Sequence, residues 1–206
     1  MAALTGAARA FTGLAAAYSL DQGGDVILPG AFKRTIADWR TSKRILPLID
    51  SHNRFSVRNV VGKLVDALET DEGLETTFQV IDGPDGDEVL RRLKGGFVDG
   101  LSIGYDPIGV RLPTPAERAR WPGVERILPE VRLREVSVVV FPMNLDATVD
   151  TATVKTPAEV NARERFLAAL TVDDTGLRPD DPRRLAMEHR CRELALATRM
   201  TRAGCN

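Results

Sequence analysis

Cysteine is scarce in this 206-residue chain, neither sign of charge is in excess, and long apolar runs are missing. The only two cysteines, Cys191 and Cys205, lie near the C-terminal end, too few and too peripheral for a disulfide framework or a cysteine-based zinc site. This use of cysteine favours a reducing compartment. The formal net charge of -1 provides no overall field that would attract nucleic acid or anionic lipid, and no apolar segment approaches the length that spans a bilayer. We therefore expect no nucleic-acid partner and no membrane partner.

The sequence does contain a series of short strand-like segments between about residues 11 and 149. In these segments apolar residues alternate with polar ones and β-branched residues are enriched, while Gly, Pro and Asp separate one segment from the next. The segments cover residues 26–28, 44–49, 59–68, 74–81, 100–110 and 133–141. Their near-regular spacing predicts a barrel or a sandwich. The expected fold class is mainly β with peripheral helices.

Three segments inside this β pattern favour helices. Residues 29–42 place large apolar side chains on one face, and residues 85–96 begin with acids and end at glycines. Both are expected to be surface helices packed on the β core. Residues 112–127 begin with prolines, but Pro122 interrupts them early, which predicts a loop or a short helix.

The character of the sequence changes after about residue 150. Residues 156–170 and 179–204 are rich in Ala, Arg, Glu and Leu with helical periodicity, and a turn-rich segment separates them. We therefore expect one domain over residues 1–150 and a helical C-terminal tail over residues 151–206. This tail would dock on the core, pair with a partner or remain solvated.

Residues 100–104 read Gly-Leu-Ser-Ile-Gly, which matches the GxSxG signature of a nucleophile elbow with Ser102 at its centre. An elbow needs a sharp strand-to-helix turn, with the acid and then the histidine further along the chain. Here two glycines and a proline within the seven residues after Ser102 exclude a stable helix, and the only later histidine, His189, lies in the charged tail. An α/β-hydrolase is therefore disfavoured, while Ser102 itself stays a candidate.

The other histidine, His52, follows a continuous apolar run, which predicts a position at the end of a buried strand. A neutral imidazole at such a place can act as a general base at neutral pH. Alternatively, residues 50–53 (Asp-Ser-His-Asn) form a turn whose polar groups bond one another. The residues alone leave both interpretations open.

Glu135 lies in a strand-like segment whose two alternating faces are both largely apolar, so we expect a buried carboxylate. Such a group is costly unless it is paired or hydrogen-bonded. One interpretation is an ion pair with Arg132, Arg134 or another arginine, and the other is a functional role. A serine, a histidine and a buried acid are the groups that nucleophilic acyl transfer requires. Their spacing does not show that they meet in space.

Four stretches resemble, in order, the prohead (capsid maturation) proteases of tailed phages and gene-transfer-agent-like elements, a family distantly similar to the herpesvirus assemblins. They are an N-terminal signature, a histidine block, a serine block and a closing strand that reads E-V-S, at residues 21–32, 46–64, 95–105 and 133–147. Four ordered motifs are far more specific than one GxSxG. The resemblance covers roughly residues 10–150. Met143 stands where the family often has alanine, a packing change expected to leave the chemistry alone.

The resemblance implies a small, mostly antiparallel β-barrel ringed by helices, in agreement with the strand pattern. It implies that His52 is the general base and Ser102 the nucleophile. Glu135 is the implied orienting acid, with Asp50 and Asp99 as rivals for that third role.

By the same resemblance, the oxyanion is bound by backbone N–H groups of a loop near a basic residue, for which Arg132 and Arg134 are nearby candidates. The implied function is a serine endopeptidase without cofactor or metal, acting in the host cytoplasm inside the assembling procapsid. Its implied substrates are the scaffold and the delta region of the major capsid protein, and the chain itself through autocatalytic cleavage. A homodimer is the implied active form, and the tail is interpreted as a segment that docks on scaffold or capsid or is removed.

Two alternatives remain beside this function. The first is a non-catalytic capsid assembly or scaffolding protein that keeps the same fold. The second is an esterase that uses the same three residues on small acyl esters. The esterase is disfavoured because no conspicuous acyl pocket or lid can be recognised in the sequence.

Overall fold

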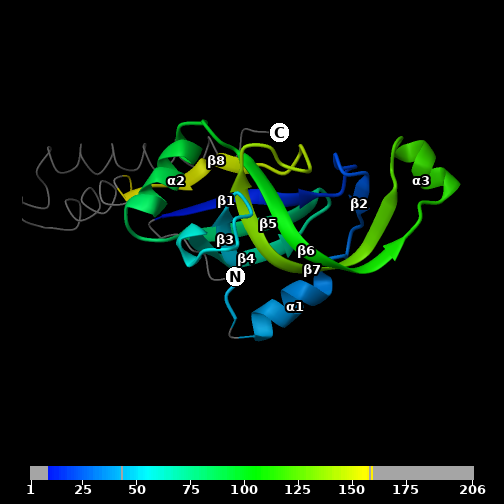
Figure 1. Ribbon diagram of the computed structural model, residues 1–206, viewed down its shortest axis with the longest axis horizontal. Coiled ribbons are helices and arrows are strands. Elements are labelled where there is room, and N and C mark those ends of the chain that lie inside the picture. The colour runs from blue at the N-terminus through cyan, green and yellow to red at the C-terminus, as the bar shows by residue number, and fades with distance from the viewer. Residues whose placement is uncertain (1–8, 43, 158, 160–206) are drawn as a thin grey trace, which may run out of the picture. The chain divides into compact units, whose positions relative to one another are not determined.

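Strands dominate the computed structural model, which describes residues 9–42, 44–157 and 159. Eight strands form one sheet (Figure 1): β1 (Ala10–Ala17), β2 (Asp25–Ile27), β3 (Pro47–Asp50), β4 (Val60–Glu69), β5 (Gly73–Val80), β6 (Gly100–Arg111), β7 (Arg126–Val139) and β8 (Val149–Lys155). The helices are α1 (Lys33–Thr41), α2 (Pro84–Lys94), α3 (Pro115–Arg120) and the short 3-10 helix η1 (Val57–Asn59). The chain forms two units, residues 1–160 and 161–206, and every described residue belongs to the first.

The sheet is mostly antiparallel. Its strands follow the order β2-β7-β3-β4-β5-β1-β8, and β6 pairs with β7. Only β2 and β3 run parallel to their neighbour β7, whereas the other paired strands are antiparallel. The Leu101 N–H of β6 donates to the Ala147 carbonyl (2.9 Å), and the Val149 N–H of β8 donates to the Asp99 carbonyl (2.7 Å). These bonds join β6 to the chain entering β8, so the sheet curls into a barrel.

In the strands of the barrel wall, residues that face the interior alternate with residues that face outward. In β5, Leu74, Thr76, Phe78 and Val80 are buried, while the residues between them are more exposed. Phe78 contacts Phe11 of β1 with a ring-centroid distance of 5.4 Å. Each large apolar side chain buried in this way contributes about 1.5–3 kcal/mol to folding. The barrel interior is therefore the main source of stability.

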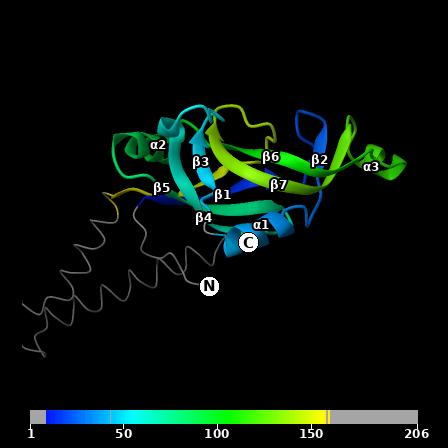
Figure 2. The same cartoon turned by 60° about the horizontal axis from the view of Figure 1, so that its bottom comes forward.

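The helices lie around the sheet, and hydrogen bonds and charged side chains stabilise their ends. Before α1, the Glu69 carboxylate of β4 accepts the N–H groups of Gly30 (2.9 Å) and Phe32 (3.2 Å), which ties the start of the helix to the sheet. The helix α2 has acids in its first turn and basic residues in its last, which suits the helix dipole. The helix α3 begins with a capping box between Thr114 and Glu117 and lies at the far end of the β6–β7 ribbon (Figures 1 and 2).

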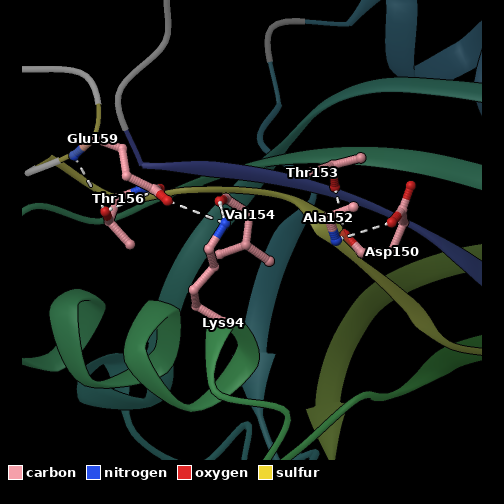
Figure 3. Close-up of polar contacts among 7 residues, drawn as sticks. All are labelled: Lys94, Asp150, Ala152, Thr153, Val154, Thr156 and Glu159. Carbon is pink, nitrogen blue, oxygen red and sulfur yellow. Dashed lines mark hydrogen bonds and ion pairs between the residues drawn. The ribbon is translucent and has the colours of Figure 1, made fainter. Parts of the chain in front are cut away.

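The last strand, β8, is held to α2 by Lys94 (Figure 3). Its ammonium donates to the Val154 carbonyl (3.2 Å) and pairs with Glu159 (3.1 Å). Glu159 in turn accepts the N–H of Thr156 (3.1 Å). Because β8 also pairs with β1, the sheet extends past residue 150.

The prediction of a mainly β fold with peripheral helices is confirmed, and all six predicted strands and three predicted helices occur. The sequence pattern does not reveal β1, whose alanines and glycine have low strand propensity, or β8, which falls in the segment expected to be helical. The strand β7 also begins well before the predicted segment 133–141. Beyond Thr156, the expected helical tail lies almost wholly outside the described residues. Among the described helices, none is long and apolar enough to cross a membrane.

Candidate active site

The strands β6 and β7 bring Ser102 and Glu135 to the same face of the sheet. In their antiparallel pairing, Ser102 lies opposite Ser137 and Gly104 lies opposite Glu135. Residues that are directly opposite share a face, and residues two apart along a strand do so as well. The three side chains are buried, with exposed fractions of 7% for Ser102, 5% for Glu135 and 0% for Ser137. The alternation of the sequence predicted the burial of Glu135, and that prediction is confirmed.

Gly104 makes room for the buried carboxylate. A Cβ atom at this position would overlap the Oε1 atom of Glu135. The second glycine of the GxSxG pattern therefore admits a neighbouring side chain, and Ser102 lies within a strand. The rejection of a nucleophile elbow is confirmed by this geometry.

His52 lies in a tight turn directly after β3. Two consecutive residues, Ser51 (φ +53°) and His52 (φ +56°), adopt the left-handed backbone conformation, which is uncommon for residues other than glycine. Several hydrogen bonds hold the turn, including Ser51 N–H to the Val138 carbonyl (3.0 Å) and Asn53 N–H to the Asp50 carbonyl (3.0 Å). Strained backbone of this kind persists only where the surroundings impose it, and it is common at functional sites.

The imidazole of His52 contacts the buried carboxylate of Glu135. The Nδ1 atom lies 2.6 Å from Oε1 of Glu135, and the imidazole side chain is 42% exposed whereas that of Glu135 is 7% exposed. Ser137 joins the two residues, because its Oγ accepts the His52 backbone N–H (3.0 Å) and donates to Oε2 of Glu135 (2.8 Å). Since an ionised carboxylate only accepts hydrogen bonds, this contact assigns the ring proton to Nδ1 and leaves Nε2 free to accept a proton.

Ser102 and His52 both line one cavity of about 280 Å³. Its wall is largely apolar, with small side chains from β1 beside larger ones from β2 and β6, among them Ala15, Ala16, Ala17, Ile27, Leu101 and Ile103. A small, mostly apolar cavity with a few polar groups is typical of a ligand site. The proposed nucleophile and base thus face a common space.

A second set of polar side chains also lines this cavity. Asp25, 4% exposed, binds the Arg126 guanidinium through both oxygens (2.7 Å from Nε and 2.5 Å from Nη2) and accepts the Tyr105 hydroxyl (3.2 Å). Burial and the nearby Asp25 carboxylate raise the pKa of Tyr105 to about 12. Burial also raises the pKa of Asp21, which lines the cavity as well. The hydroxyl of Tyr105 therefore stays protonated at neutral pH, and we assign no catalytic role to this group.

The other residues singled out in the sequence lie apart from the His52–Glu135 contact. Asp50 is exposed and accepts the Ser51 hydroxyl (2.7 Å), and Asp99 is also exposed. Arg132 and Arg134 are exposed residues that alternate with the buried face of β7, and Arg134 pairs with Asp106 of β6.

Of the two interpretations of Glu135, the ion pair with an arginine does not occur. The pairing of β3 with β7 places His52 against the acid, and the neighbouring arginines point to the other face of the strand. The turn interpretation of residues 50–53 is confirmed, and the hydrogen bonds of this turn place His52 beside Glu135.

Sequence reasoning missed Ser137 and the Asp25–Arg126 pair. Ser137 shares a face with Glu135, two residues earlier in β7, so alternation could have identified it as a second buried polar group. Asp25 and Arg126 are 101 residues apart and meet only through the parallel pairing of β2 with β7. No local pattern indicates such a pair.

A serine and an imidazole at one cavity of a curled β-sheet, with a buried carboxylate in contact with the imidazole, are the parts of a serine hydrolase. In this class the base takes the serine proton, the acid fixes the imidazole, and backbone N–H groups stabilise the oxyanion. The contact between Nδ1 of His52 and Oε1 of Glu135 is the kind of contact by which an acid fixes an imidazole.

The chain belongs to the caudovirus prohead serine protease family, whose model matches residues 3–162. The resemblance noted in the sequence motifs is thereby confirmed. The chain is also 31% identical over 146 residues to the prohead protease of Enterobacteria phage HK97, an alignment that covers 68% of this chain and 58% of that protein. The chain therefore spans less than two thirds of the length of this relative.

Solved structures that align with this chain include the protease of Kaposi's sarcoma-associated herpesvirus. In complex with a hexapeptide phosphonate inhibitor, it aligns with a TM-score of 0.42 at 14% identity, covering 78% of this chain and 76% of that one. In complex with a dimer disruptor, the TM-score is 0.35 at 13% identity, covering 80% of this chain and 92% of that one.

Proposed function

We propose that this chain is a serine endopeptidase of prohead maturation, with Ser102 as nucleophile, His52 as general base and Glu135 as orienting acid. The observation that carries the proposal is the 2.6 Å contact between Nδ1 of His52 and Oε1 of Glu135, at a cavity that Ser102 also lines. Membership of the prohead serine protease family supports it.

The proposed mechanism follows from the hydrogen-bond directions. The Nε2 atom of His52 accepts the Ser102 hydroxyl proton as Oγ attacks the scissile carbonyl carbon. The imidazolium that forms is stabilised by the carboxylate of Glu135. When the tetrahedral intermediate collapses, the imidazolium gives its proton to the leaving amine. Water then attacks the acyl carbon of the acyl-enzyme: Nε2 of His52 takes a proton from the water and gives it to Oγ of Ser102 as the ester bond breaks.

The proposed substrates are capsid proteins of the assembling prohead. We infer that the enzyme removes the scaffold or delta region of the major capsid protein, cleaves itself, and acts inside the procapsid in the host cytoplasm. The name of the HK97 relative supports the setting in a prohead. The domain boundary near residue 150, a homodimeric active form, and docking or removal of the tail over residues 151–206 remain predictions of the same proposal.

The proposal is tested by co-expression of the full chain with the major capsid protein of the same phage, followed by intact-mass measurement of that capsid protein. Wild type is expected to give a shortened capsid protein and Ser102→Ala a full-length one. Ser42→Ala, which changes an exposed serine at the end of α1, is the matched control and is expected to process normally.

Two results would overturn the proposal. Processing by Ser102→Ala equal to wild type excludes Ser102 as the nucleophile. Full-length capsid protein with the wild-type chain, together with normal particle assembly, supports the non-catalytic scaffolding protein instead.

A further inference from the structure

We propose that Ser137 is a positioning residue of the active site, whose hydroxyl fixes His52 and Glu135 relative to each other. This inference rests on the proposed function and adds a fourth residue to it. The side chain of Ser137 is completely buried and makes two hydrogen bonds, one to the backbone of His52 and one to the carboxylate of Glu135.

The directions of these two bonds are fixed by the chemistry of the groups. The His52 backbone N–H can only donate, so Oγ of Ser137 must accept it at 3.0 Å. The hydroxyl proton of Ser137 is then available for Oε2 of Glu135, 2.8 Å away, since an ionised carboxylate only accepts. Oε2 is thereby occupied, and Oε1 is left to face Nδ1 of the imidazole.

The same hydroxyl also supports the unusual backbone of the base. His52 has a φ of +56°, and its N–H group is turned toward β7, where Ser137 accepts it. Without this acceptor, the N–H group would lose its partner inside the protein, and a bond that holds the strained conformation would be lost. The inference is that Ser137 holds both the acid and the backbone of the base.

Ser137 occupies the one strand position that links the three parts of the site. In the pairing of β7 with β6 it lies opposite Ser102, and in the pairing with β3 it lies beside Ile49, three residues before His52. A hydroxyl here reaches the turn after β3 that carries His52 and the acid of its own strand, at the position opposite Ser102.

Thr76 provides a matched comparison, because it is also a buried hydroxyl in a strand of the same barrel. It is 1% exposed, and its Oγ1 donates to the Gly13 carbonyl at 2.9 Å, but it contacts none of the three proposed site residues. Removing the hydroxyl of Ser137 or of Thr76 eliminates hydrogen bonding in the protein interior. Only the loss at Ser137 is expected to change the chemistry at Ser102.

The experiment measures the reaction of the full chain with a fluorophosphonate probe and separates the limiting rate constant kinact from the half-saturation concentration KI. Ser137→Ala is expected to lower kinact by about ten- to a hundredfold, because small displacements of catalytic groups have effects of that size, and to leave KI within about twofold. Ser137→Thr, which keeps the hydroxyl, is expected to restore most of kinact. Thr76→Val is expected to lower the thermal midpoint and leave kinact unchanged.

A second measurement tests whether Ser137 acts through Glu135. In a Glu135→Gln background, Ser137→Ala is expected to lower kinact by clearly less than it does in the wild-type background, because the bond to the carboxylate no longer contributes and only the bond to the His52 backbone remains to be lost. If Ser137→Ala does not fold, Ser137→Cys replaces it, since a thiol is a weaker donor of similar size, and kinact must then fall below wild type.

Wild-type kinact in folded Ser137→Ala or Ser137→Cys would overturn the inference, as would a full additional loss of kinact in the Glu135→Gln background. These results leave the proposed function intact as long as Ser102→Ala is not labelled. Labelling of Ser102→Ala at the wild-type rate would overturn the proposed function itself.

Discussion

The inner half of the β6–β7 ribbon, around Ser102, and its outer half, taken together with α3, each hold a hydrogen-bonded carboxylate, in opposite surroundings. In the inner half, the carboxylate of Glu135 is buried and contacts His52 and Ser137. In the outer half, the carboxylate of Glu117 lies near solvent and pairs with Arg111 (2.5 Å). Both carboxylates are fully hydrogen-bonded, so pairing alone does not distinguish them. Burial does, because water can replace the partner of Glu117 but not those of Glu135.

The largest difference between the two halves is expected when each carboxylate is replaced by its amide. Glu135→Gln no longer fixes the imidazole tautomer or stabilises the imidazolium, and the rate of fluorophosphonate labelling is expected to fall by about a thousandfold or more. Glu117→Gln serves as the control in the outer half and is expected to label at the wild-type rate. Equal labelling rates for the two variants would remove Glu135 from the site.

A glycine-to-alanine change in each half sharpens the comparison. Gly104→Ala places a methyl group where Oε1 of Glu135 lies, so the carboxylate must move away from His52, and labelling is expected to slow by about ten- to a hundredfold. Gly109→Ala in the outer half meets a ring carbon of Pro129 at 3.0 Å and is expected to label normally. If Gly104→Ala labels as fast as Gly109→Ala, the position of the carboxylate does not control the rate.

Asp25 is as buried as Glu135, but its partner is an arginine, Arg126, that is 52% exposed. Asp25→Asn keeps the size of the side chain and removes the charge, and we expect the free energy of unfolding in urea to fall by about 1–2 kcal/mol. Asp38→Asn, at an exposed position of α1, is the control and is expected to change little. An unchanged unfolding curve for Asp25→Asn would show that Asp25 contributes no more than a surface charge.

The smallest effect is expected for the outer ion pair, and it depends on pH. The Arg111 guanidinium lowers the pKa of Glu117 from 4.5 to about 2. A carboxyl group whose folded-state pKa is depressed stabilises the fold above its unfolded-state pKa, and this contribution is lost as the pH falls through the folded-state value. Urea midpoints of wild type and Glu117→Gln should thus differ slightly at pH 6 and converge near pH 2. If the urea midpoints still differ at pH 2, the ionised carboxylate of Glu117 is not the cause of the difference.

The sequence predicts the members of the site better than their contacts. Ser102 and His52 follow from ordered motifs, and the burial of Glu135 follows from apolar residues on both faces of its strand. The contact between His52 and Glu135 joins residues 83 apart, and only the pairing of β3 with β7 brings them together. Local periodicity carries no information about which strands become neighbours, so the sequence left an arginine partner and a functional role for Glu135 equally open.

The strands of the fold likewise fall into those that the local sequence predicts and those that form only through tertiary pairing. Strands with alternating β-branched residues are predicted correctly, whereas β1 forms from a run of alanines because its neighbours β5 and β8 supply hydrogen-bonding partners on both sides. Tertiary pairing overrides weak local propensity there. The strand β8 illustrates the same effect at the boundary where the composition begins to favour helix.

The most direct test of the central claim locates the fluorophosphonate adduct by tandem mass spectrometry in the full chain and in its His52→Ala variant. We predict an adduct on Ser102 in the wild type and its loss, to below about one hundredth of the wild-type rate, when the imidazole is removed. An adduct on another serine, or labelling of Ser102 at the same rate without His52, would contradict the account.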